Sequence, residues 1–180
     1  MQRLDRAFYR QSAPDLAPQL LGKLLCRRIG RRVVRQRITE TEAYYGEDDS
    51  ACHASRGRTP RTSIMYADGG HAYVYLCYGM HEMFNIVSGG KGFPEAVLVR
   101  GVEGHAGPGR LTRALRITRG LNREDLTRSR RLWLEDDGFR CGHAASPRIG
   151  IGYASPRDRA RLWRFTVGLR ASCRLNSSQT

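Results

Sequence analysis

The sequence lacks any long apolar run. Its most apolar stretch, Tyr73 to Met80, is far shorter than the roughly 20 residues that a membrane-spanning helix requires. The opening residues, MQRLDRAFYRQSAPD, lack the apolar core of a signal peptide. We therefore expect a protein that has no membrane anchor and that is located in the cytoplasm, or on the nucleoid in a bacterium.

The motifs of several enzyme classes are also missing. The five cysteines are scattered and form no CxxC pair, so neither a zinc finger nor a disulfide framework is indicated, and we expect reduced, mostly buried thiols. The GGKG segment at 89–92 lacks the Lys-Ser/Thr pair of a P-loop and is interpreted as a turn. No GxSxG motif is present. A serine hydrolase or an NTPase is therefore poorly supported.

Acidic residues and lysines are scarce relative to arginines. The chain has 31 Lys plus Arg against 17 Asp plus Glu, a formal net charge of +14, and its only lysines are Lys23 and Lys91. Such a surface favours a polyanionic partner, because contacts with phosphates release condensed counterions. The charge therefore favours a nucleic acid, with a membrane surface or no polyanion as the alternatives.

The length of 180 residues suits one compact domain over residues 1–180, and 40% hydrophobic residues is an ordinary globular content. Hydrophobic periodicity, caps and turn residues predict a series of elements. These are a helix over 12–25 capped by Ser12, a hairpin of 26–29 and 33–43 around Gly30, a long loop at 46–71, a hairpin of 72–78 and 82–88, a strand at 96–102, a helix over 110–118 ended by Gly120, and strands at 131–135, 148–153 and 161–167. Their irregular order favours an α+β fold. The tail after about residue 170 is expected to be disordered.

Two carboxylates stand out in the second strand. Glu40 and Glu42 are two residues apart, so their side chains share a face that also carries Val34, Gln36 and Ile38. Carboxylates that follow apolar positions on one face need partners if they are buried. They are candidates for catalysis, but a strand that frays to solvent, or pairing with arginines, would explain them equally. The pattern does not choose between the two glutamates.

Tyrosines and histidines form a second group of candidates. Tyr73 and Tyr75 share a strand face and would either pack in the core or stack on nucleic-acid bases. The spacings of His53, His71 and His81 match no zinc pattern, so no metal or other cofactor is expected.

Long segments of the chain resemble the alkyladenine (3-methyladenine) DNA glycosylase family, the type without a helix-hairpin-helix. The resemblance is carried by ITETEAYYGEDDSACHASRGRTPR at 38–61 and HAYVYLCYGMHEMFNIV at 71–87, and it continues through EAVLVR, GPGRLTRALRI, RIGIG and RLWRFTV. It implies a single α+β domain with a curved antiparallel sheet, flanking helices and a β-hairpin that enters the DNA minor groove. It also implies hydrolytic excision of alkylated and some deaminated purines from duplex DNA.

The resemblance assigns roles to particular residues. It makes Glu42 the general base, Glu40 a supporting acid and Arg100 a residue that helps to hold the water, with main-chain groups near Ile151 completing the water site. The residues that would line the base pocket are Tyr44, His53, Tyr75 and Asn85. Tyr78 would be the wedge that fills the gap left by the flipped base. Thr62 and the loop at 65–70 depart from the family's usual residues.

The expected protein is thus a monomeric, monofunctional DNA glycosylase that needs no cofactor. Base flipping is required because a base within a duplex is unreachable. One alternative is a non-catalytic basic module that uses the same tyrosines as a stacking platform. Another is a metal-dependent nuclease that uses the histidines with Asp48 or Asp49.

Overall fold

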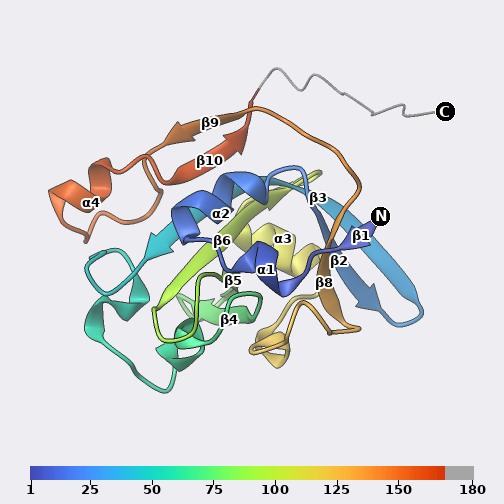
Figure 1. Cartoon of the computed structure of the whole chain (residues 1–180), viewed down its shortest axis with the longest axis horizontal. Helices are drawn as coiled ribbons and strands as arrows, with labels where there is room; N and C mark the ends of the chain where they lie inside the picture. The colour runs from blue at the N-terminus through green and yellow to red at the C-terminus, as the bar shows by residue number, and fades with distance from the viewer. Residues whose placement is uncertain (169–180) are drawn as a thin grey trace.

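The computed structural model describes residues 1–168 and shows a mainly antiparallel sheet with a few short helices (Figure 1). The strands are β1 (Gln2–Arg3), β2 (Leu24–Ile29), β3 (Arg32–Tyr45), β4 (Ala72–Cys77), β5 (His81–Val87), β6 (Glu95–Val102), β7 (His105–Ala106), β8 (Leu132–Asp136), β9 (His143–Ser146) and β10 (Arg164–Val167). The helices are α1 (Arg6–Tyr9), α2 (Ala13–Gln19), α3 (Pro108–Ala114) and α4 (Pro156–Ala160), with 3₁₀ turns η1 (His53–Arg56), η2 (Thr62–Tyr66) and η3 (Arg119–Leu121). This arrangement confirms the predicted α+β class.

The long strand β3 joins two parts of the sheet. Its first half pairs with β2, which continues to β8 and β1, and its second half pairs with β6 on one side and β10 on the other. The register against β6 shifts twice between Ile38 and Thr41. Such irregularities bend a strand and increase its twist. Glu40 and Glu42 therefore lie where β3 leaves one part of the sheet and enters the other.

The main core lies between this sheet and helices α2 and α3. Leu16 and Leu20 at α2, Leu111 on α3, and Phe84 and Val97 on the strands are all fully buried. In Figure 1, α2 crosses the strands near their centre and α3 lies close to β5 and β6. This apolar packing fixes the strands from which the candidate residues project.

Helix α2 begins as predicted but ends early. The Ser12 hydroxyl oxygen accepts a hydrogen bond from the Asp15 N–H, which confirms Ser12 as the N-cap. The helix ends at Gln19, and Leu24 and Leu25 belong to β2 instead. Gly22 has φ of +81°, a left-handed conformation that favours glycine, and the chain turns there towards the sheet.

Both predicted hairpins are confirmed, whereas one predicted strand is wrong. Residues 148–153 form turns, and Gly150 adopts φ of +76°, although isoleucine and tyrosine favour strands.

The helix predicted over 110–118 spans only Pro108–Ala114, so Gly120 does not end it. Helices α1 and α4 and strand β9 were not predicted. The expected disordered tail lies outside the described residues.

The predicted loop at 46–71 contains η1 and η2. Thr62, one of the departures from the family pattern, is buried; its hydroxyl accepts from the Thr59 N–H at 2.8 Å and donates to the Gly57 carbonyl at 3.1 Å. The side chain therefore closes the turn that precedes η2. No helix among residues 1–168 is both long and apolar enough to span a bilayer.

Candidate active site

Glu42 is a fully buried carboxylate held from three directions. Its Oε1 accepts from the Ile149 N–H at 2.7 Å, and its Oε2 accepts from the Tyr44 hydroxyl at 2.8 Å and lies 3.4 Å from Arg100 Nη1. An isolated buried carboxylate is costly, so these contacts explain how the side chain is tolerated within the sheet. The main-chain group that contacts Glu42 belongs to Ile149, not to Ile151. The Ile151 side chain instead packs with Ala51.

Glu40 lies on the same face of β3 and is more exposed. Its Oε1 accepts from Arg100 Nε at 2.9 Å and from Arg164 Nε on β10 at 2.6 Å. Arg100 therefore bridges both carboxylates, whereas Arg164 contacts Glu40 alone. The shared face predicted for the two glutamates is confirmed, and the alternative in which arginines pair them also holds.

Burial raises the pKa of Glu42 above its ordinary value, although the Arg100 charge and the hydrogen bonds from Ile149 and Tyr44 act in the opposite direction. The Arg100 charge therefore favours the ionised form, but burial has the larger effect. Burial and the adjacent Glu42 raise the pKa of Tyr44, so its hydroxyl keeps the proton that it donates.

A buried ion pair holds the segments around Glu42 together. Arg148 and Asp49 form two hydrogen bonds, of 2.6 and 2.8 Å, and both side chains are almost completely buried. Arg148 also donates to the Ala43 carbonyl at 2.9 Å, and its guanidinium lies 4.9 Å from the centre of the Tyr44 ring. Because Arg148 directly precedes Ile149, this pair positions the N–H that contacts Glu42. Asp49 is thus committed to an ion pair, which contradicts its use as a metal ligand.

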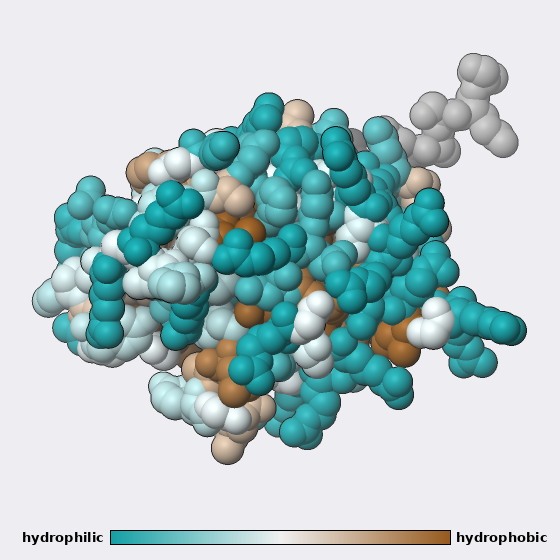
Figure 2. All heavy atoms as spheres, turned by 90° about the horizontal axis from the view of Figure 1, so that it is seen from below, coloured by the Kyte–Doolittle hydropathy of each residue, from teal (hydrophilic) through white to brown (hydrophobic). Residues whose placement is uncertain are grey.

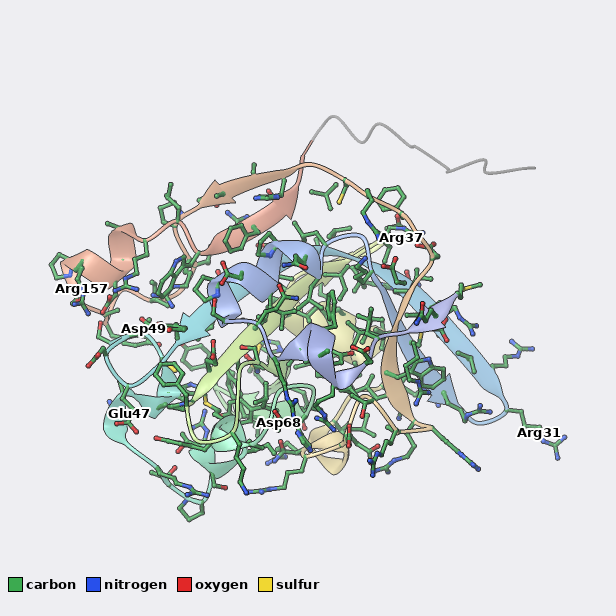
Figure 3. All side chains as sticks on the ribbon, in the orientation of Figure 1. Arg31, Arg37, Glu47, Asp49, Asp68 and Arg157 are labelled. Carbon is green, nitrogen blue, oxygen red and sulfur yellow. The ribbon has the colours of Figure 1, made fainter. Side chains whose placement is uncertain are left out.

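Figure 3 shows Glu47 and Asp49 in the loop that follows β3. That loop has a second attachment, since Asp158 of α4 accepts from the Ser50 N–H at 3.0 Å and from the Ser50 hydroxyl at 2.6 Å. The buried Asp158 and the Arg148–Asp49 pair together fix the loop that leads into the aromatic pocket.

Next to Glu42, aromatic side chains surround a pocket. The His53 ring lies edge-on to Tyr75, with centroids 4.6 Å apart, and the Tyr73 and Tyr75 rings are 5.3 Å apart. His53 Nδ1 lies 3.0 Å from the Tyr73 hydroxyl. Asn85 is buried and donates to the Tyr73 carbonyl at 3.2 Å. The structure therefore brings His53, Tyr75 and Asn85 together with Tyr44 around one cavity.

This cavity is small, with a volume of about 40 Å³. That is far below the roughly 300–1,000 Å³ of a typical ligand pocket, so a purine needs more room than this cavity provides. An open cleft of about 440 Å³ lies beside it, and its walls include Tyr44, Tyr75, Tyr78, Arg100, Ile149 and Tyr153. Tyr153 lines both spaces and is 70% exposed, and its hydroxyl donates to the Ala51 carbonyl at 3.1 Å.

Burial lowers the pKa of His53 to about 4, and the nearby charges of Arg61 and Arg56 add to this effect. The imidazole is therefore neutral at pH 7. No group of three or more His, Cys, Asp or Glu side chains that could hold a metal ion occurs within residues 1–168. Cys26 and Cys52 are buried free thiols, whereas Cys77 and Cys141 are half-buried and Cys173 lies outside the described residues.

Tyr78 occupies the tip of the β4–β5 hairpin. Its side chain is 89% exposed, and its backbone has φ of +50°, followed by Gly79 at +71°. Because Cys77 pairs with His81, the loop has three residues, and its first two are left-handed, a conformation that normally favours Asn, Asp or Gly. The exposure excludes a core role for Tyr78. The side chain lines the open cleft that also reaches Arg100.

Comparison with known proteins assigns the chain to a family. The model of the methylpurine-DNA glycosylase (MPG) family matches residues 7–106 and 103–170. A protein of Borrelia garinii subsp. bavariensis named "Putative 3-methyladenine DNA glycosylase" is 44% identical, with 91% of this chain and 95% of that protein covered. A protein of Methanocella arvoryzae with the same name is 43% identical, with 92% of each chain covered. The chain belongs to the methylpurine-DNA glycosylase family.

Within this glycosylase, sequence reasoning missed several residues that complete the site. Ile149, Arg148 and Tyr153 lie in a segment that was predicted to be a strand, and Arg164 lies on β10. The even spacing of Glu40 and Glu42 was a usable signal for a paired site. No comparable signal exists for contacts between residues that are about 100 positions apart, such as Arg148 with Asp49.

Proposed function

We propose that this protein is a monofunctional DNA glycosylase that flips an alkylated purine, of the 3-methyladenine type, out of duplex DNA and hydrolyses its N-glycosidic bond. The observation that carries the proposal is the buried Glu42 carboxylate, whose three partners Tyr44, Arg100 and Ile149 all line the cleft beside the aromatic pocket. The family membership supports DNA as the substrate.

In the proposed reaction, the C1′–N bond breaks and its electron pair leaves with the base. The sugar develops oxocarbenium character, and water attacks C1′ while Glu42 takes the water's proton, as carboxylates do in glycoside hydrolysis. A base that is already cationic is a good leaving group. Water must enter from the cleft, because the contacts of Arg100, Tyr44 and Ile149 enclose the carboxylate.

The pocket suits a cationic base. Tyr44 and Tyr75 line the cavity, and each ring already has a guanidinium near it, Arg148 at 4.9 Å from the centre of Tyr44 and Arg61 at 4.9 Å from that of Tyr75, in line with the attraction of cations to the ring quadrupole. Because the pKa of His53 is lowered to about 4, its ring adds no positive charge that would repel the base. In the proposed complex the exposed Tyr153 rotates away to admit the purine, since its side chain lines both the small cavity and the cleft. Deaminated purines are neutral and would lack the cation–π contribution.

The function is tested by incubating a methylated duplex with the protein in the presence of EDTA. We expect released 3-methyladenine and an intact strand that carries an abasic site. Binding without release would favour a non-catalytic basic module. Strand cleavage that EDTA abolishes would favour a metal-dependent nuclease.

We predict that the protein forms no covalent adduct with DNA. Glycosylases that also cut the strand use an amine nucleophile to form a Schiff base. Lys23 is buried and paired with Asp136 at 2.6 Å, and Lys91 lies in the turn before β6. Borohydride treatment during turnover should therefore trap no protein–DNA adduct, and a trapped adduct would refute the monofunctional mechanism.

We predict that Tyr78→Ala slows excision roughly 10- to 100-fold from a well-paired site. In the proposed mechanism Tyr78 fills the gap in the base stack and so offsets unstacking, which costs on the order of a few kcal/mol. The defect should shrink for the same lesion in a bulge, where the base is already partly unstacked. Single-turnover rates on the two substrates measure the difference.

The matched control is Met80→Ala, because Met80 is also exposed, at 69%, and follows in the same turn. It should have a much smaller effect on both substrates. An equal loss on both substrates for Tyr78→Ala, or a Met80→Ala defect of the same size, would argue against Tyr78 as the wedge.

A further inference from the structure

A group of arginines gathers at the end of the molecule where the β2–β3 hairpin turns. Among the residues that the structure describes, none of them has a carboxylate within salt-bridge distance. We call this group the distal arginine cluster; its members are Arg27, Arg28, Arg31, Arg32, Arg116, Arg128 and Arg130. Figure 2 shows that the surface at this end, on the right of the view, is largely hydrophilic, with long side chains that project into solvent.

Hydrogen bonds to main-chain carbonyls of the cluster and of the adjacent Arg131 hold the Arg27 and Arg28 side chains in place. The Arg27 guanidinium donates to the carbonyls of Arg28 at 2.7 Å, of Arg131 at 3.1 Å and of Arg116 at 3.2 Å. Arg28 Nε donates to the Arg130 carbonyl at 3.1 Å. These bonds fix like charges beside one another, which is unfavourable unless anions approach them.

The environment of the Arg27 guanidinium reflects the nearby positive charge. Burial lowers its pKa, and the positive charge of Arg131 lowers it further. Its Nε is buried and has no hydrogen-bond partner. By contrast, some arginines elsewhere on the surface, such as Arg10 with Asp68 and Arg140 with Asp136, are paired with carboxylates. Unpaired arginines also occur elsewhere among the described residues, for example Arg56 and Arg113, but here seven of them come from neighbouring segments.

The cluster lies far from the proposed catalytic carboxylate. Arg32 begins β3 and Glu42 is ten positions further along the same strand, a path of about 33 Å at roughly 3.3 Å per residue. Figure 3 likewise shows Arg31 at the opposite end of the molecule from Asp49, which lies beside the site. One turn of B-DNA spans about 34–36 Å. Because β3 bends between Ile38 and Thr41, this path is an upper bound, and the two regions are separated by up to about one helical turn of a duplex.

We propose that the distal arginine cluster is a second DNA-binding surface, which contacts the phosphates of the duplex up to about one helical turn away from the nucleotide in the pocket. Arginine is suited to this role because its planar guanidinium binds phosphate in a bidentate manner. The proposal rests on the proposed function, in which the pocket receives the damaged nucleotide. It adds a contact that strengthens binding to undamaged flanking DNA without entering the chemistry.

The test compares two triple variants that change the charge equally. The first, Arg31→Ser with Arg32→Ser and Arg130→Ser, removes exposed arginines whose side chains make no hydrogen bond to described residues. The second, Arg10→Ser with Arg35→Ser and Arg140→Ser, removes three arginines that are paired with carboxylates. Binding to an undamaged duplex of about 36 bp is measured from 50 to 200 mM salt, together with single-turnover excision from lesion duplexes of about 12 and 36 bp.

For the distal variant, the slope of log affinity against log salt should fall by about 0.9 per lost phosphate contact, or about 2.7. The parent protein should then lose about 40-fold more affinity than this variant between 50 and 200 mM salt. The variant's maximal excision rate should match the parent's, and its half-saturating concentration should rise on the long duplex only.

Equal salt slopes for the two triple variants would overturn the proposal, as would an equal rise in half-saturating concentration on both duplex lengths. If no protein releases a base, the proposed function fails, and the salt slopes on undamaged DNA still decide whether the cluster binds duplex phosphates. The same salt series is also measured with an acidic polypeptide in place of DNA. If the distal variant changes the salt slope for the polypeptide but not for DNA, the cluster is assigned to a protein partner and the proposal is overturned.

Discussion

Replacing Glu42 with glutamine should lower the rate of base excision by at least about 100-fold, the lower end of the range for loss of a general base. Glutamine keeps the size of the side chain and can still accept from the Ile149 N–H, so the pocket should stay intact. What disappears is the negative charge that takes the proton from water in the proposed mechanism. Single-turnover excision from a methylated duplex measures the rate, and binding to the same duplex should survive.

Glu40→Gln is the matched control, because it changes the same group two positions away on the same strand face. Glu40 contacts Arg100 and Arg164 but neither Tyr44 nor Ile149, so we expect the smaller loss. If Glu40→Gln abolishes excision while Glu42→Gln is mild, the assignment of the two glutamates is reversed.

The pH dependence follows from the same carboxylate. Burial raises the pKa of Glu42, and only its ionised form can act as a base. Excision should therefore increase with pH through this raised pKa and decline below it. The Glu42→Gln protein should lack this increase of the excision rate with pH.

Arg148→Met should lower the free energy of unfolding by about 3–5 kcal/mol, because it leaves the Asp49 carboxylate buried without its partner. For a protein of this size each kcal/mol corresponds to about 2–4 °C in melting temperature, so a decrease of about 6–20 °C is expected. Methionine retains much of the side-chain volume, which separates the loss of charge from the loss of packing. Thermal unfolding followed by circular dichroism provides the measurement.

Arg10→Met is a close control. Arg10 also forms a bidentate pair with an aspartate, at 3.0 and 2.8 Å from Asp68, but its side chain is exposed. Solvent weakens such pairs, so the melting temperature should hardly change. Adding Asp49→Leu to Arg148→Met should recover part of the lost stability, since no buried charge remains. A large decrease in melting temperature for Arg10→Met would show that the geometry of the ion pair, not its burial, controls the loss of stability.

The parts of the fold that sequence predicted are those with local causes. Ser12 caps α2 through a partner three residues away, and Gly30 and Gly79 allow the left-handed turns of the two hairpins. The period of two placed Glu40 and Glu42 on one face, and it placed Tyr73 beside Tyr75. Each of these predictions depends only on residues that are close in sequence, and the structure confirms them.

The parts that sequence missed depend on distant contacts. Residues 148–153 carry strand-forming side chains, but Arg148 is held by Asp49 and Ala43, and Gly150 turns the chain away. The chain therefore presents the Ile149 N–H to Glu42 instead of pairing with a neighbouring strand. The residue pattern also could not decide between Glu40 and Glu42; the resemblance to a known family favoured Glu42, and that choice stays a prediction, which the two glutamine variants test.

The distance in sequence between Glu42 and Ile149 has a consequence for protein synthesis. Their hydrogen bond joins positions 107 residues apart, and the bond from Arg164 to Glu40 joins positions 124 apart. At roughly 5–20 residues per second, a ribosome needs on the order of ten seconds to proceed from one partner to the other. During that interval the emerging chain holds both glutamates without these partners. A nascent chain should therefore be unable to process DNA until β10 has left the ribosome.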